Sequence, residues 1–344
     1  MRMNIALVGC GAIARVHVKA IARTGNAHLI AVCDTVEKNA AQMAAVWKIP
    51  HYYASLSEML KNEDLSIVSI LTPVTTHAPL AVEAINHGTN VLLEKPLTMT
   101  VQEADQVLES LAKNRGVKLT VNYSMLMSEV MKKALTLARN GQLGEILGID
   151  IKLLHTTEDS MASDMNHWSH RLPGGRFGEM LSHPVYIIQA LLGNNLSVED
   201  VQTAKRGNYS WMPHDELYAT LRGGDALGTI HVSFNCPRPM HQVSIYGTKK
   251  ILLVNTSDQI LIELGARGFG KTEAAKDAVR LSEKLLVSAA KNAATYLFRE
   301  SSETAFEMAY RSLIDSIRYD RPPLVTPEMA YQTVKIVEEI CRAM

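Results

Sequence analysis

The sequence has few cysteines, no net charge and no long apolar run, and each absence excludes a class of protein. Its four cysteines are too few and too scattered for a disulfide framework, which favours buried free thiols in a reducing compartment: Cys10, Cys33, Cys236 and Cys341. The 35 basic and 35 acidic residues cancel, so no global field attracts nucleic acid or an acidic membrane. No apolar stretch reaches the ~18 residues that span a bilayer. We therefore expect a cytoplasmic protein without a nucleic-acid partner.

The first 34 residues carry a pattern typical of dinucleotide binding. An apolar run of strand length leads into Gly9-x-Gly11-x-x-Ala14, and a helical segment follows. Gly9 permits a tight turn, Gly11 lets a pyrophosphate approach the backbone, and Ala14 allows close helix packing. A second apolar run ends in Asp34, at the distance where a carboxylate binds the ribose hydroxyls. The opening letters also resemble a short secretory signal, but the pattern continues past any cleavage point.

Cofactor preference follows from the residues at the end of the second run. The Asp34 carboxylate repels a 2′-phosphate, and it is followed by Thr35 rather than by an arginine. This arrangement favours NAD, and makes NADP the less favoured cofactor.

The alternation of strand and helix patterns divides the chain of 344 residues into two expected domains. Apolar runs separated by helical segments predict an α/β fold with a doubly wound parallel sheet over residues 1–122, with strands at 3–10, 27–34, 65–73, 89–96 and 117–123. Residues 123–344 contain strand-like runs that follow one another without helices between them. That pattern predicts an α+β domain with an open, mostly antiparallel sheet.

At Glu94-Lys95-Pro96 the sequence resembles the glucose–fructose oxidoreductase / inositol dehydrogenase / MocA family. The resemblance extends to the Gly9–Ala14 pattern, to the turn around Thr72 and Pro73, and to residues 172–193. It implies a Rossmann domain followed by a domain whose open sheet forms a homodimer or homotetramer interface, and an NAD(P)-dependent dehydrogenase or reductase of sugars or related polyols. The implied cofactor-binding residues are Gly9, Gly11, Ala12, Ile13, Ala14, Asp34, Thr72, Pro73, His77, Glu94 and Lys95.

Three positions depart from the pattern of this family. Val74 stands where members often carry Asn, and Glu179 replaces the Asp of an Asp-x-x-x-His motif that ends here in His183. A second Asp often follows that histidine by three residues, and here the residue is Tyr186. The departures leave the expected fold unchanged, but they weaken any transfer of substrate identity.

The resemblance places Lys95, His183 and Glu179 in catalytic positions, and their chemistry suits hydride transfer. A lysine beside the nicotinamide can hydrogen-bond the reacting oxygen, and the ordinary pKa of histidine, ~6.5, suits proton transfer in both directions. Glu179 lies four residues before His183, on the same face of a predicted helix, where it would orient the imidazole or raise its proton affinity. We expect Lys95 and His183 to handle the proton of a sugar hydroxyl or ketone.

The segment before this helix combines flat aromatic faces with hydrogen-bond donors, as sugar-binding sites do. The expected substrate-binding residues of this segment are His167, Trp168 and Arg171, and Tyr123 at the end of the fifth predicted strand is expected to join them. His167 and His170 have a His-x-x-His spacing, but nothing else completes a ligand set, so we expect no metal.

Two alternative activities and one surface feature remain open. The Glu and His pair would also serve a redox-neutral glycosidase or lyase, in which NAD oxidises the sugar transiently. The three departures motivate a further alternative, a non-catalytic, NAD-binding regulatory protein. Residues 271–299 read as a basic helix packed on its own subunit or a neighbour, with peripheral contact to an anionic membrane as the second interpretation.

Overall fold

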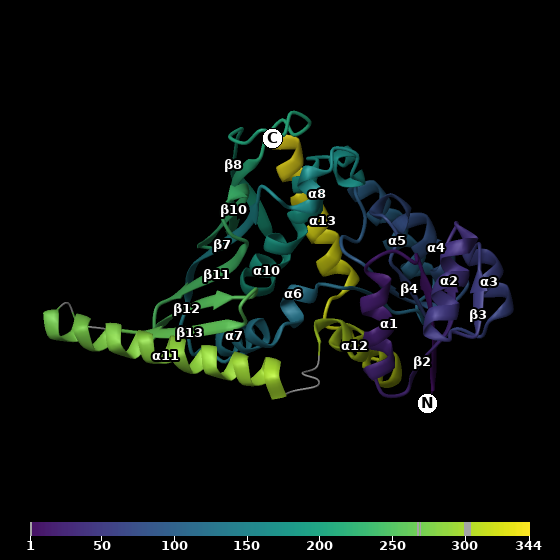
Figure 1. Cartoon of the computed structure of the whole chain (residues 1–344), viewed down its shortest axis with the longest axis horizontal. Helices are drawn as coiled ribbons and strands as arrows, with labels where there is room; N and C mark the ends of the chain where they lie inside the picture. The colour runs from purple at the N-terminus through teal and green to yellow at the C-terminus, as the bar shows by residue number, and fades with distance from the viewer. Residues whose placement is uncertain (1, 267, 269, 299–303) are drawn as a thin grey trace. The chain divides into compact units, whose positions relative to one another are not determined.

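The computed structural model describes residues 2–266, 268, 270–298 and 304–344, and it separates into two compact units. The first unit comprises Met1–Met127 and Glu303–Lys335, and the second comprises Ser128–Ser302 and Ile336–Met344. The first unit therefore contains a segment from near the C-terminus. In Figure 1 this segment is the yellow α12 (Ala305–Tyr319), which packs beside the purple α1 (Ala14–Arg23).

A six-stranded parallel sheet forms the core of the first unit, in the order β3-β2-β1-β4-β5-β6. Its strands are β1 (Met3–Val8), β2 (Ala27–Cys33), β3 (His51–Tyr53), β4 (Ile67–Ile70), β5 (Asn90–Leu93) and β6 (Leu119–Val121). The strands are short and apolar because helices cover both faces of such a sheet. The doubly wound fold is confirmed. The added strand, β3, has three residues and no buried side chain, so it leaves no apolar signal in the sequence.

Helices connect these strands and place the loops at their carboxyl ends. Besides α1 and α12 they are α2 (Glu37–Trp47), α3 (Leu56–Asn62), α4 (His77–Asn86), α5 (Val101–Lys113) and α6 (Ser124–Met127), with the first part of α13 (Pro327–Ala343). The strand order reverses direction between β1 and β4. In an open α/β sheet, ligands bind in the crevice at this switch point.

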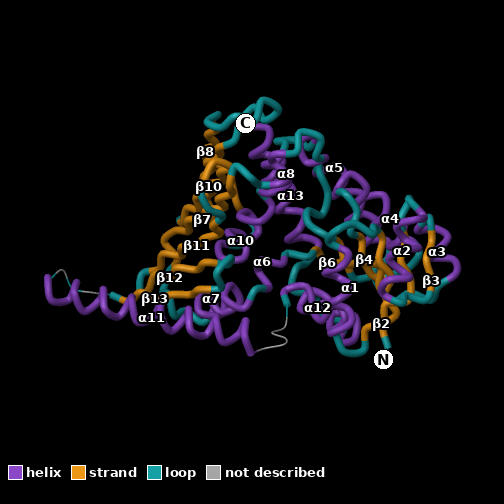
Figure 2. The backbone as a smooth tube through the Cα atoms, in the orientation of Figure 1, coloured by secondary structure: helices purple, strands orange, loops and turns teal. Residues whose placement is uncertain are grey.

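The second unit contains a seven-stranded mixed sheet, in the order β13-β12-β11-β7-β10-β9-β8 (Figure 2, orange strands). The strands are β7 (Ile146–Thr156), β8 (Leu196–Ala204), β9 (Glu216–Gly223), β10 (Ala226–Cys236), β11 (Met240–Gly247), β12 (Lys250–Asn255) and β13 (Ile260–Gly265). Only β7 and β10 run parallel among the described pairs, so the expected mostly antiparallel sheet is confirmed.

Helix α10 (Ser182–Leu192) packs on β7 and β10 of this sheet. Gly228 of β10 permits the approach, because a Cβ there would lie 2.8 Å from Cδ1 of Ile188. The other helices of the unit are α7 (Glu129–Arg139), α8 (Ser160–Ser163), α9 (Arg176–Met180) and α11 (Lys271–Phe298).

The basic segment forms the long helix α11, which contacts β13. Lys276 pairs with Glu273, and Lys284 donates to the main-chain carbonyl of Glu263. Arg299 and the side chains of residues 291–298, including Lys291, lie outside the described residues, so membrane contact through 271–299 stays a prediction. Within the described part of the chain, no helix is long and apolar enough to cross a bilayer.

Candidate active site

The first unit contains a cavity of about 550 Å³ at the carboxyl ends of β1, β2 and β4. Its lining includes five of the predicted cofactor residues: Gly9, Gly11, Asp34, Thr72 and Pro73. Gly9 has φ +97°, and a Cβ there would lie 3.0 Å from main-chain atoms of Leu71 and Thr72. Around Gly11 an added Cβ would meet nothing within 4 Å, so the backbone is open to a ligand. This bare, glycine-lined wall fits the pyrophosphate of a dinucleotide.

Asp34 lies at the end of β2 and turns its carboxylate toward backbone donors. Its Oδ2 accepts from the Cys10 N–H at 2.9 Å, and its Oδ1 accepts from the Val36 N–H at 2.9 Å. These two bonds fix the acid on the wall of the cavity. The thiol beside it is inert at neutral pH, because burial and the Asp34 charge raise the pKa of Cys10 to about 12.

The loop that carries Lys95 rests on a buried polar network. Glu94 Oε1 accepts from Asn122 Nδ2 at 2.6 Å and lies 2.9 Å from His17 Nε2, while Oε2 accepts from the Lys95 N–H at 3.2 Å. Burial alone would raise the pKa of the Glu94 carboxyl, but the His17 and Asn122 hydrogen bonds and the Lys95 charge outweigh it and hold the pKa below its ordinary value. Glu94 is therefore an anion that fixes the backbone at Lys95.

Two members of this network were not predicted from the sequence. His17 lies on α1, three residues after the glycine pattern, and its Nδ1 is 2.9 Å from the Tyr310 hydroxyl of α12. That hydroxyl donates to Ser69 Oγ of β4 at 3.0 Å. The position of His17 just after the fingerprint is a usable signal, whereas Tyr310 is 293 residues further along the chain.

His77 connects the loops that follow two neighbouring strands, β4 and β5. Its Nδ1 lies 2.8 Å from the Pro96 carbonyl and its Nε2 lies 2.9 Å from the Thr72 carbonyl. Burial lowers the pKa of His77, although both carbonyl contacts oppose the shift. A neutral imidazole carries one N–H and donates to one of these carbonyls at a time. His77 therefore fixes the loops that contain Thr72 and Lys95, and its predicted contact with the cofactor stays a prediction.

In the second unit, Glu179 forms an ion pair with Arg176, one turn earlier on α9. The Arg176 side chain is 3% exposed and lies 5.5 Å from the ring centre of Phe234. A second carboxylate, Asp159, lies 3.8 Å from the same guanidinium and accepts from the Ala162 N–H at 2.8 Å. Burial opposes ionisation of Asp159, but the hydrogen bonds from His155 and Ala162 and the Arg176 charge lower its pKa to about 2.

His183 lies in the first turn of α10, and its imidazole contacts a tyrosine on the same face of the helix. Nδ1 of His183 is 2.7 Å from the Tyr186 hydroxyl, and the two rings meet edge to face at 5.6 Å. From Leu181 to Gln189, His183 is the one residue that is not buried. The helix therefore presents the imidazole at its surface while it holds the neighbouring side chains in the core.

The predicted substrate-binding residues differ in accessibility. Trp168 is 37% exposed and Arg171 is exposed, on a short 3-10 turn that His167 caps through the Ser169 N–H. Burial lowers the pKa of His167. Tyr123, in contrast, is fully buried in the first unit, where its phenol hydrogen-bonds Thr333. The substrate roles of all four residues stay predictions.

Ala12 is exposed, Ile13 is partly exposed and Ala14 is buried at the start of α1, as a helix that begins beneath a dinucleotide requires. Glu94 and Lys95 are partly exposed. Among the described residues, no group of three or more His, Cys, Asp or Glu side chains is arranged to hold a metal ion.

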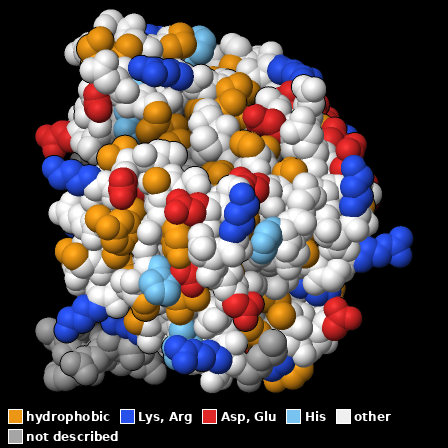
Figure 3. Space-filling model, turned by 90° about the vertical axis from the view of Figure 1, so that its right-hand side faces the viewer, with side chains coloured by type: hydrophobic (Ala, Val, Ile, Leu, Met, Phe, Trp, Pro, Cys, Tyr) orange, Lys and Arg blue, Asp and Glu red, His pale blue; other side chains and the backbone are white. Residues whose placement is uncertain are grey.

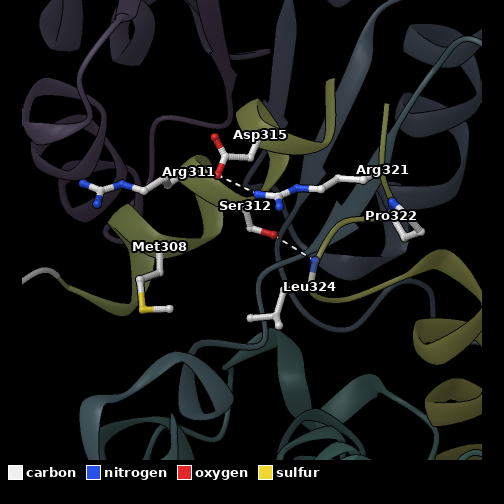
Figure 4. A pocket seen from close by; sticks show the side chains of 7 residues that line it. All are labelled: Met308, Arg311, Ser312, Asp315, Arg321, Pro322 and Leu324. Atoms are coloured by element: carbon white, nitrogen blue, oxygen red, sulfur yellow. Dashed lines mark hydrogen bonds and ion pairs between the residues drawn. The ribbon is translucent and has the colours of Figure 1, made fainter. Parts of the chain in front are cut away.

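A second cavity of the first unit, of about 380 Å³, lies between α12 and the segment that follows it (Figure 4). Arg321 pairs with Asp315 at 2.9 Å, and Ser312 Oγ accepts from the Leu324 N–H at 2.8 Å. These contacts hold the turn after α12 in place.

The face of the molecule drawn in Figure 3 intersperses acidic and basic side chains, in keeping with the absence of net charge.

The glycine-lined cavity, the terminal acid of β2 and the parallel sheet define an NAD(P)-binding oxidoreductase fold. The chain belongs to the GFO/IDH/MocA oxidoreductase family. Residues 3–123 match its NAD-binding Rossmann domain and residues 136–344 match its C-terminal alpha/beta domain.

Similar proteins include an oxidoreductase of Formosa agariphila, 26% identical over 212 residues, which are 60% of this chain and 64% of that protein. An alpha-N-acetylgalactosaminidase of Shewanella oneidensis is 30% identical over 177 residues, 48% of this chain and 38% of that protein. Among solved structures, the WlbA dehydrogenase of Bordetella pertussis in complex with NADH and UDP-GlcNAcA has a TM-score of 0.81 at 22% identity, covering 99% of this chain and 95% of that one. This last likeness shows the fold.

Proposed function

We propose that the protein is an NAD-dependent dehydrogenase or reductase acting on a CH–OH group, which transfers hydride to or from a sugar or sugar derivative. The observation that carries the proposal is the Glu94 network, which fixes the backbone of Lys95 at the carboxyl end of β5, next to the β4 strand of the switch point. The bound nicotinamide would supply the hydride chemistry. Lys95 would hydrogen-bond the reacting oxygen, and His183 would take or return its proton.

NAD is the proposed cofactor because of Asp34. Its carboxylate lines the cavity and would accept hydrogen bonds from the adenosine ribose, where a 2′-phosphate would meet a like charge. A sugar substrate is supported by the WlbA complex and by the partly exposed Trp168, which offers a flat face to a sugar ring. Glu179, ion-paired with Arg176, would lie near the acid–base helix.

The test is a panel of sugars, cyclitols and nucleotide-sugars with NAD or NADH, followed at the absorbance band of the reduced nicotinamide. We expect turnover with at least one carbohydrate and a preference for NAD over NADP. Tight NAD binding with no turnover on the whole panel would contradict the proposal and favour a regulatory protein.

A second candidate function is redox-neutral glycoside cleavage, which the similarity to the Shewanella alpha-N-acetylgalactosaminidase supports. In that reaction NAD would be reduced and reoxidised within one catalytic cycle. Chromogenic glycosides distinguish the two, because cleavage without any net change in reduced nicotinamide would favour the second candidate.

A further inference from the structure

We infer that Tyr186 is a positioning residue for His183, which it holds through Nδ1 so that Nε2 is the atom that exchanges a proton with the substrate. This inference rests on the proposed function for its catalytic meaning. The contact that carries it is the 2.7 Å approach of the Tyr186 hydroxyl to His183 Nδ1.

The position of Tyr186 on α10 allows it to hold the His183 ring in one orientation. His183 and Tyr186 are three residues apart on α10, so their side chains lie on one face of the helix. Tyr186 is fully buried, and its helix packs on β7 and β10, so the phenol has little freedom to follow a rotating imidazole. The buried tyrosine therefore sets the orientation of the partly exposed histidine.

A phenol at this position differs from a carboxylate in the proton it carries. A carboxylate only accepts hydrogen bonds, whereas the Tyr186 hydroxyl both donates and accepts. When Nδ1–H donates to the phenol oxygen, Nε2 holds the lone pair of the neutral ring and can take a proton from a hydroxyl. After that transfer Nδ1–H still donates to the same oxygen, so the support serves both protonation states.

The charged groups of the neighbouring helix α9 are already paired with each other. Arg176 binds Glu179 and lies 3.8 Å from Asp159, which stands in the chain between β7 and α8. The phenol of Tyr186 is neutral, so it adds no charge beside His183. The arrangement separates two tasks, since Arg176 holds the carboxylate Glu179 and Tyr186 orients the imidazole.

The test compares Tyr186→Phe with Tyr246→Phe, a matched loss of a phenol hydroxyl that donates to Asp150 at 2.7 Å elsewhere in the second unit. The ¹⁵N chemical shifts of the His183 ring report its tautomer without any substrate. We expect the neutral ring to be mainly the Nδ1–H form in the native protein and in Tyr246→Phe, and to shift toward the Nε2–H form in Tyr186→Phe. We also expect kcat of Tyr186→Phe to fall about 10-fold to 100-fold, with the KM for substrate and the Kd for NAD within about twofold of native values.

An unchanged tautomer in Tyr186→Phe overturns the inference, with or without a known substrate. A changed tautomer with kcat equal to that of Tyr246→Phe also overturns it, because the tyrosine would then be merely structural. If the native protein turns over no carbohydrate while the His183 signals respond to Tyr186→Phe, the proposed function fails and the pairing of the two side chains stands.

Discussion

Nε2 of His17 lies 2.9 Å from Oε1 of Glu94, which joins the first helix of the Rossmann unit to the loop that carries Lys95. Asn122 and the Lys95 N–H also point donors at this carboxylate. The Glu94-Lys95-Pro96 segment is thus held by residues from α1 and from the end of β6. Tyr310 of α12 contributes indirectly, through its contact with His17.

Replacing Glu94 by Gln should destabilise the protein by about 1–3 kcal/mol, because an amide NH₂ would meet donors that now share a carboxylate. Urea unfolding of Glu94→Gln measures the loss. Glu58→Gln, whose side chain lies on the exposed surface of α3, is the control and should leave the midpoint nearly unchanged. If Glu94→Gln is as stable as the control, the hydrogen bonds of Glu94 do not stabilise the fold.

Asp34→Ala should weaken NAD binding by about 1.5–3 kcal/mol for each ribose hydrogen bond lost, and should raise the relative affinity for NADP. Calorimetric titration of both cofactors measures the change. Asp34→Asn keeps an acceptor for the Cys10 N–H and removes the charge, so it separates the backbone contact from the charge effect. If neither variant alters the ratio of the two affinities, Asp34 does not select the cofactor.

Asp159→Asn should cost about 2 kcal/mol near neutral pH, because the folded-state pKa of about 2 lies below the ordinary value of 3.8. A depressed pKa gives stability that is fully present above the unfolded value and is lost as the pH falls through the folded value. The difference between native protein and variant should therefore shrink from about pH 4 to about pH 2. Denaturation midpoints across that range check this, and the exposed Asp320→Asn should show a smaller and flatter difference.

The antiparallel part of the fold carries an exposed sheet face that we propose as the subunit interface. Tyr218 of β9 and His231 of β10 are directly opposed and stack at 4.1 Å, and Leu227 on the same face is 38% exposed. We expect a homodimer or homotetramer in light scattering and a smaller species for Leu227→Asp. Val46→Asp, on the exposed surface of α2 in the first unit, is the control and should keep the native mass. A native protein that is monomeric at micromolar concentration would contradict the interface.

The sequence predicted the elements whose signals are local. Apolar runs marked β1, β2, β4 and β5, and the glycine spacing marked the cavity wall, because each depends on neighbouring residues. Some elements escaped prediction, three of them for clear physical reasons. The exposed β3 has no apolar pattern, β8 has no buried side chain, and α12 joins the first unit through contacts such as Tyr310 with His17 that span 293 residues.

The predicted site residues also divide into those with a local sequence signal and those without one. Gly9, Gly11 and Asp34 line the cavity, and the turn and the strand end that carry them could be recognised because they are local features. The partners that orient the catalytic candidates could not be read in this way. Arg176 beside Glu179 and Tyr186 beside His183 follow helical spacing, but spacing alone does not say which neighbouring side chains meet.

The central claim is that Lys95 and His183 handle the proton of one hydride transfer, and steady-state kinetics of the two single alanine variants and the double variant test it most directly. We predict that His183→Ala lowers kcat by about 10²-fold to 10⁴-fold with little change in NAD affinity, while His28→Ala, exposed at the opposite end of β2 from Asp34, retains native turnover. Lys95→Ala should lower kcat similarly and also loosen NAD, and the double variant should be little worse than the worse single one, because the two groups act as a unit. A His183→Ala enzyme with near-native kcat on a substrate that the native enzyme turns over would contradict the account.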